Sequence, residues 1–174
     1  LKLDDMPDQA VHVAKFCIAD TVGVSLAGIE EPVVRIVTQT LEIERTPGPC
    51  FIFGSNRRGT ALDAALINGA AAHALDYDDC STIMGGHPSA PVVPAVIALA
   101  EEIGASGKEV LEAFIVGVET EIRLARGVLP HHYEKGWHPT STLGVFGAAA
   151  ACTRLLKLDD EQMSRAIEAE QARR

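Results

Sequence analysis

The chain has 174 residues, of which 47% are hydrophobic, and a formal net charge of −9. This length suits one domain or part of a larger protein, and the apolar share is sufficient for a sizeable core. Beyond Arg57-Arg58 and the terminal Arg173-Arg174 the sequence has no basic cluster. It therefore argues against nucleic acid and against an anionic membrane as partners.

The cysteines and the apolar runs bear on the cellular setting. No CxxC pair occurs, so the sequence indicates neither a disulfide framework nor a zinc site of that type, and we expect a reducing, cytoplasmic environment. The segment LKLDDMPDQ is acidic and polar, unlike a targeting peptide. The most apolar run, residues 143–152, is too short to span a bilayer, so we predict no transmembrane segment.

The pattern of residues in the first part of the chain predicts two helices, then one short strand, then a third helix. Apolar residues recur at three- and four-residue spacing over residues 8–27, which predicts a helix ended by a glycine. A second helix is expected over residues 33–45, between prolines, and a strand over residues 50–53. Thr60 is the expected N-cap of a third helix, with Asp63 three residues later.

Serines are the predicted N-terminal caps of the next two helices. Ser89 is expected to cap a fourth helix that reaches Ile103, with a proline in its first turn. Ser106 and Glu109 form a capping box before a longer helix with an apolar stripe.

The remainder predicts a loop and two more helices. Residues 129–139 are expected to form the loop, and residues 140–156 a sixth helix, whose small side chains let a neighbouring helix approach closely. Asp159 is expected to cap the last helix. Helices joined by short connections predict an all-α, multi-helix bundle, with residues 1–174 in a single helical domain.

The richest stretch for chemistry is NGAAAHALDYDDCSTIMGGHPS. If the helix continues, His73 and Asp76 share a face because they lie three residues apart. Asp78 and Asp79 follow directly, and glycines and a proline place His87 on a turn. A histidine beside a carboxylate suits proton transfer near neutral pH.

The segment GWHPTS repeats this arrangement further along the chain. His138 stands before a proline, and the hydroxyls of Thr140 and Ser141 follow at an expected helix start. Two interpretations stay open at this point. The histidines and acids form a polar pocket for proton transfer, or they cap helix ends and satisfy loop backbone groups.

The sequence also contains residues that suit other kinds of site. The pair of His73 and Asp76, with the following acids and His87, could hold a divalent ion, but the spacing matches no metal motif, so we predict no metal. Arg57-Arg58 could bind an anion, but we favour the interpretation that it is a solvated basic turn. We interpret Cys80 as a small residue rather than a nucleophile.

The segments NGAAAHALDYDD, GHPS and GWHPTSTLGVFGAAAA together closely resemble the MmgE/PrpD family. This family includes 2-methylcitrate dehydratase, cis-aconitate decarboxylase and iminodisuccinate epimerase. The resemblance extends to about Arg165. It implies a helical domain paired with a smaller α+β domain, usually in a homodimer, with the active site between the two domains. It also implies proton chemistry beside a carboxylate of a small di- or tricarboxylate, with no metal and no organic cofactor.

Residue roles follow from the matching motifs. The resemblance implies catalytic roles for Asp76, His87 and His138, and substrate-binding positions at His73, Cys80, Ser81, Thr140 and Ser141. Decarboxylase-like members carry a hydroxyl residue where this chain has Cys80. The short loop between Asp79 and His87 resembles the epimerase branch.

The length also departs from the family, whose members are more than twice as long, and the ending AIEAEQARR differs from their usual continuation. We therefore expect this chain to be the N-terminal part of a two-domain lyase or isomerase, with the smaller domain absent and little turnover on its own. The alternative is a non-catalytic helical module for interaction or dimerisation.

Overall fold

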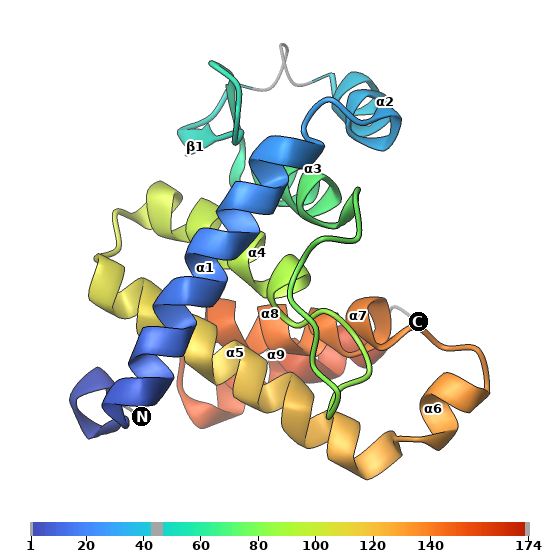
Figure 1. Cartoon of the computed structure of the whole chain (residues 1–174). Coiled ribbons are helices and arrows are strands. Elements are labelled where there is room, and N and C mark those ends of the chain that lie inside the picture. The colour runs from blue at the N-terminus through green and yellow to red at the C-terminus, as the bar shows by residue number, and fades with distance from the viewer. Residues whose placement is uncertain (1, 43–46, 173–174) are drawn as a thin grey trace.

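A computed structural model describes residues 2–42 and 47–172 of the chain. Helices dominate these residues, which confirms the all-α prediction (Figure 1). In chain order they are the 3-10 turn η1 (Leu3–Asp5), α1 (Asp8–Gly28), α2 (Pro32–Thr40), α3 (Ala61–His73), α4 (Ser89–Ile103), α5 (Gly107–Val128), α6 (His131–Glu134), α7 (Pro139–Thr142), α8 (Gly144–Leu155) and α9 (Asp160–Ala172).

The strand-like run is shorter than predicted. Only Cys50–Phe51 forms a strand, β1, and it pairs antiparallel with β2 (Arg58–Gly59), which the sequence did not predict. The Arg58 guanidinium lies 4.9 Å from the centroid of the Phe51 ring and donates to the Pro49 carbonyl. Arg58 thus belongs to the hairpin. The predicted end of the second helix falls in residues 43–46, outside the described residues.

Most predicted helix caps are confirmed. The Thr60 hydroxyl accepts the Asp63 N–H at 3.2 Å. Ser106 and Glu109 form the reciprocal capping box, in which the Glu109 carboxylate accepts the Ser106 N–H at 2.8 Å. An Asp159 carboxylate oxygen accepts the N–H of Gln162, also at 2.8 Å. Local sequence alone therefore determines where these helices begin.

The prediction for Ser89 is wrong. Ser89 is the first residue of α4, and it caps no backbone group with its side chain. Its hydroxyl instead donates to the Asp79 carboxylate at 2.6 Å, and its N–H donates to the same carboxylate at 3.1 Å. An acid in the preceding loop thus takes over the capping role and ties the loop to α4.

The segment between α5 and α8 is more helical than the predicted loop, because it contains α6. The predicted sixth helix is also divided. Leu143, with φ −102° and ψ −33°, separates α7 from α8. His138 lies at the start of α7, so the short helix sets the direction in which this histidine leaves the chain.

The core lies around α4, which contacts α1, α3, α5 and α8 (Figure 1). Its largest cluster is built from Val92, Val93, Val96, Phe114 and Leu155, all buried. A second cluster, with Ile52, Ile67 and Ala71, joins α2 and α3 to β1. Complete burial of such a side chain contributes about 1.5–3 kcal/mol, so these clusters hold the ends of α3 and α4 in place.

Small residues bring α5 and α8 together, as the sequence predicts for the sixth helix. A Cβ atom on Gly117 would lie 2.7 Å from the Gly147 carbonyl oxygen, closer than side chains tolerate. The two backbones therefore touch without intervening side chains. This contact fixes α8, and through it α7, against the rest of the bundle.

Helix α1 is long and apolar enough to cross a membrane, by length and composition alone. Its mean hydropathy reaches 1.4, and 17% of the window is buried. The sequence reading considered only residues 143–152 and missed this helix. In the structure α1 packs on α3, where a Cβ atom on Gly28 would lie 2.2 Å from the Ala71 carbonyl oxygen. Length and composition do not distinguish a membrane span from a helix packed in this way.

Glu121 of α5 is a buried acid. It is 0% exposed, and neither carboxyl oxygen has a hydrogen-bond partner within residues 2–42 and 47–172. Burial, followed by the negative charge of Asp79, raises its pKa from 4.5 to about 9. A carboxyl group in this position is neutral at pH 7. Gly144 and Gly147 lie directly beside it.

We predict that Glu121 makes the folded state less stable as pH rises. Because its pKa is about 9 in the folded protein and 4.5 ordinarily, the folded state binds one more proton between these values. Stability is then fully present below about pH 4.5 and falls towards pH 9. Glu121→Gln should remove this decline, and thermal unfolding at pH 5 and pH 8 measures it. The exposed Glu102→Gln is the control, and an equal decline in wild type and Glu121→Gln would contradict the prediction.

Candidate active site

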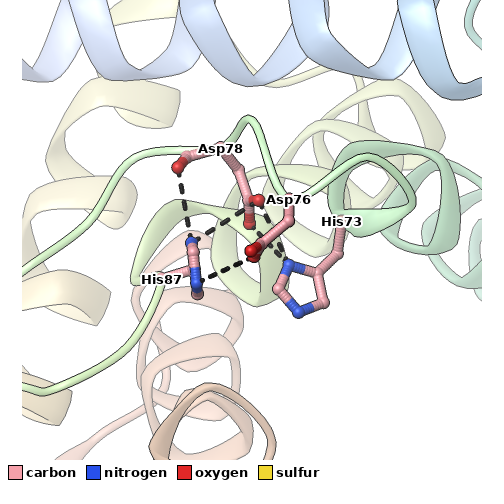
Figure 2. Close-up of side chains that lie close together, drawn as sticks. All are labelled: His73, Asp76, Asp78 and His87. Atoms are coloured by element: carbon pink, nitrogen blue, oxygen red, sulfur yellow. Dashed lines mark hydrogen bonds and ion pairs between the residues drawn. The ribbon is translucent and has the colours of Figure 1, made fainter.

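His73 and Asp78 form the best-defined contact of the candidate site. His73 is the last residue of α3, and its Nδ1 atom lies 2.9 Å from one Asp78 carboxylate oxygen and 3.1 Å from the other. The Asp78 side chain is completely buried, whereas the His73 side chain is 36% exposed. The carboxylate therefore holds one edge of the ring and leaves the other edge accessible (Figure 2).

Asp76 lies outside the helix, so the predicted shared helical face with His73 is wrong. The helix ends at His73, and Asp76 has a φ of 56°, a left-handed conformation that aspartate adopts more readily than most residues. The chain turns at this point. Asp76 nevertheless returns to the same cluster, because its carboxylate lies 3.3 Å from His87 Nε2.

His87 lies between two carboxylates (Figure 2). Its Nε2 atom faces Asp76, and its Nδ1 atom lies 3.5 Å from an Asp78 carboxylate oxygen and 3.3 Å from the Asp78 carbonyl oxygen. Sequence reasoning named Asp78 only as a possible metal ligand and missed this central position. No local pattern marks this position, because the buried surroundings of Asp78 are created by α3 and the closed loop together.

The backbone around His87 is fixed by contacts across the fold. Its N–H donates to the Thr140 hydroxyl at 2.9 Å. A Cβ atom on Gly86 would lie 2.8 Å from that same oxygen, so the loop approaches α7 as closely as a glycine allows. The Ser81 N–H also donates to the Gly86 carbonyl at 2.9 Å. His87 is therefore held on a closed loop rather than on a free turn.

His138 completes a group of three imidazoles. Its ring stacks on His73 with centroids 5.9 Å apart, and it lies 6.2 Å from His87. The His73 and His87 rings are 4.8 Å apart. His138 is exposed, like Asp76, so the cluster is open to solvent on this side. The rings come from the end of α3, from the following loop and from the start of α7.

The remaining predicted site residues divide into two groups. Cys80 and Thr140 contact His87, with the Cys80 sulfur 3.7 Å from Nδ1. Ser81 and Ser141 bind backbone groups, because the Ser81 hydroxyl accepts the Met84 N–H at 3.2 Å and the Ser141 hydroxyl donates to the His138 carbonyl at 3.1 Å. The second pair thus shapes the loops that carry the histidines.

This arrangement suits proton transfer. A carboxylate that accepts an Nδ1–H proton fixes the tautomer and ring orientation and leaves Nε2 to face a substrate. Asp78 is placed to do this for His73, and Asp76 faces the other nitrogen of His87. Ligand atoms from His73, Asp76, Asp78 and His87 all lie within 4.8 Å of one another, so the same four side chains could hold a metal ion.

Comparison with known families identifies the family of the chain. A family model described as the MmgE/PrpD N-terminal domain matches residues 1–170. The chain belongs to the MmgE/PrpD family. The four residues drawn in Figure 2, His73, Asp76, Asp78 and His87, lie within the matched range.

Curated relatives carry one activity in their names. The chain is 32% identical to cis-aconitate decarboxylase of Homo sapiens over 173 residues, which is 96% of this chain and 36% of the human protein. It is 33% identical to the Mus musculus enzyme of the same name, over 91% of this chain and 33% of that protein. It is 28% identical to cis-aconitate decarboxylase of Aspergillus terreus, over 96% of this chain and 35% of that protein. The chain thus spans about a third of the length of these relatives.

We predict that Thr140→Val destabilises the protein by about 1–3 kcal/mol, because the His87 N–H loses its acceptor in a largely buried position. Thr140→Ser keeps the hydroxyl and is the matched control, with a smaller effect expected. Urea unfolding followed by circular dichroism measures both variants. Equal stability of the Val and Ser variants would show that this hydrogen bond does not hold the loop.

Proposed function

We propose that this chain provides acid–base groups of a cofactor-independent lyase or isomerase that acts on a small di- or tricarboxylate. The observation that carries the proposal is the group of three imidazoles around the buried carboxylate of Asp78. Membership of the MmgE/PrpD family, with relatives named cis-aconitate decarboxylase, supports the class of substrate.

The proposed chemistry is proton transfer at a carbon beside a carboxylate. In a decarboxylation, the C–C bond to the departing carboxylate breaks, CO2 leaves, and the acid delivers a proton to the carbanion that remains. His87 and His138 act as the acid–base pair, and Asp76 binds or deprotonates the substrate with His87. The developing negative charge is met by imidazolium and hydroxyl donors. His73 supports the pair, because it is held by Asp78 and stacks on His138.

Among the reactions that the resemblance covers, decarboxylation of cis-aconitate is our first choice. The support is the name shared by the human, mouse and Aspergillus relatives. Cys80 stands where decarboxylase-like members carry a hydroxyl residue, and its sulfur lies 3.7 Å from His87 Nδ1. A thiol there offers a weaker hydrogen-bond donor to the substrate. Dehydration of 2-methylcitrate and epimerisation of iminodisuccinate are the alternatives.

The exposure of the cluster leads to a further part of the proposal. Proton abstraction beside a carboxylate is favoured in a site that excludes water. Asp76 and His138 are exposed in this chain, with the Asp76 side chain 78% exposed. We therefore propose that efficient turnover needs an additional protein surface over this side, and that the chain by itself binds substrate with little catalysis.

We predict that cis-aconitate or citrate raises the melting temperature of the chain, because a ligand of the folded state stabilises it. His138→Ala and Asp76→Ala should abolish the rise, since both side chains lie on the open side of the cluster. His131→Ala, which alters an exposed histidine paired with Glu134, is the control. Thermal-shift titrations, including 2-methylcitrate and an aspartate-derived diacid, measure the effect. No shift with any acid in folded protein would contradict substrate binding by this chain.

A second proposal is that the chain also acts as an association module. Phe16 is 69% exposed on α1, three residues from Val13, which is 50% exposed on the same face. On α3, Leu62 is 84% exposed and Leu66 is 53% exposed. Exposed apolar side chains that share a helix face are typical of surfaces that bind another protein. We propose a homodimer.

We predict that the chain self-associates in sedimentation velocity experiments at increasing concentration. Phe16→Ser should weaken the association if α1 contributes, and Leu62→Ser should do so if α3 contributes. His131→Ser, at an exposed histidine outside both helices, is the control. A single monomeric species over the whole concentration range would contradict the dimer.

A further inference from the structure

We propose that His73, Asp76, Asp78 and His87 form a binding site for one Zn²⁺ ion, and that the bound ion blocks the acid–base function of the cluster. One ligand atom from each of these side chains lies within 4.8 Å of all the others. Metal binding requires no turnover, so the binding site stands independently of the function proposed above, whereas the blocking effect rests on that function.

The spacing of the donor atoms is close to that of a zinc site. Zinc binds nitrogen and oxygen at about 2.1 Å, so two donors of a tetrahedral ion lie about 3.4 Å apart. His87 Nε2 lies 3.3 Å from an Asp76 oxygen, and His73 Nδ1 lies 2.9 Å from an Asp78 oxygen. The 4.8 Å limit of the cluster exceeds the tetrahedral spacing, so the ligands must contract around the ion.

Unequal burial shows how this contraction can occur. The Asp78 side chain is 0% exposed and the His87 side chain 12%, so these two ligands are already fixed. Asp76 is 78% exposed, and it lies on a turn, free to move towards the ion. The His87 N–H donates to the Thr140 hydroxyl, and Ser89 donates to the Asp79 carboxylate, so the loop on which His87 lies is held at both ends. Two ligands that are already fixed and an adaptable Asp76 favour capture of an ion.

The chemistry of the donor set selects the metal. Imidazole nitrogens favour zinc and its transition-metal neighbours over magnesium and calcium, which prefer oxygen. Two carboxylates balance the two positive charges of the ion, so no unpaired charge is buried. The sequence offers the same residues as possible ligands, but their spacing matches no metal motif, because they come from the end of α3 and from a closed loop rather than from one face of one helix.

Inhibition follows from the same atoms. A bound Zn²⁺ takes the nitrogen lone pairs of His73 and His87 and both carboxylates. The imidazoles then neither accept nor deliver a proton, and Asp78 no longer orients them. The ion and a polycarboxylate substrate would also compete for the open side next to Asp76.

Calorimetric titration of the metal-free chain with Zn²⁺, and visible absorption with Co²⁺ as a probe, test the site. We expect one equivalent to bind, with the intense bands of a four- or five-coordinate Co²⁺ ion. Asp76→Asn and His73→Asn should each weaken binding by at least about 100-fold, because removing a direct ligand costs more than removing an outer partner of a ligand, which costs about 10–100-fold. His131→Asn, at an exposed histidine–glutamate pair elsewhere, should bind as the wild type does.

Cys80→Ser separates this site from a thiol site, since the Cys80 sulfur lies 3.7 Å from His87 Nδ1. We expect Cys80→Ser to retain the full affinity. The proposal is overturned if the folded wild type binds no stoichiometric ion, if binding survives in both Asp76→Asn and His73→Asn, or if Cys80→Ser loses it. Asp76 is exposed, so its variant tests the site without disturbing the core, and circular dichroism verifies the fold.

Discussion

The buried carboxylate of Asp78 is the interaction on which the site depends. It contacts Nδ1 of His73 and lies near Nδ1 of His87, and so joins the end of α3 to the loop before α4. A fully buried carboxylate is costly unless it is paired, so the two imidazoles must stay where they are for Asp78 to remain buried. The Asp78 side chain therefore both holds this part of the fold together and positions the two histidines. The His138 ring then stacks on an imidazole that is already fixed.

The helical bundle provides the frame for this interaction. Backbone contact at Gly117 and Gly147 sets α8 against α5, and α7 precedes α8 directly with His138 at its start. On the other side, Asp79 binds the first residue of α4 through two hydrogen bonds. Its charge also contributes to the raised pKa of Glu121, so the loop acid and the helix interior are electrostatically linked. The three histidines thus lie on separate segments, each of which is held in place by the same helical core.

Sequence reasoning predicted features that depend on neighbouring residues. The capping box at Ser106 and the cap at Thr60 are encoded within a few residues, and the structure confirms both. The role of Ser89 was predicted wrongly because its partner, Asp79, lies ten residues earlier in the loop. The β1–β2 pairing and the break at Leu143 likewise depend on tertiary contacts that no local pattern contains.

In the site too, sequence reasoning predicted what depends on local motifs and missed what depends on tertiary contacts. The motifs drew attention to His73, Asp76, His87 and His138, and the structure brings these residues together. Local pattern could not show that Asp76 leaves the helix, because a φ of 56° is a property of the turn rather than of the residue sequence. It also missed Asp78 as the centre, since its burial is created by α3 and the closed loop together.

Histidine-selective ¹⁵N NMR tests the central claim most directly, namely that the imidazole cluster binds a small polycarboxylate and takes part in proton transfer. Signals of the labelled chain are followed during a titration with cis-aconitate. We expect the ring nitrogens of His87 and His138 to shift together, while those of His131, which lies in an exposed pair with Glu134, stay unchanged. Unchanged signals from the cluster at saturating ligand, in protein that remains folded, would contradict the account.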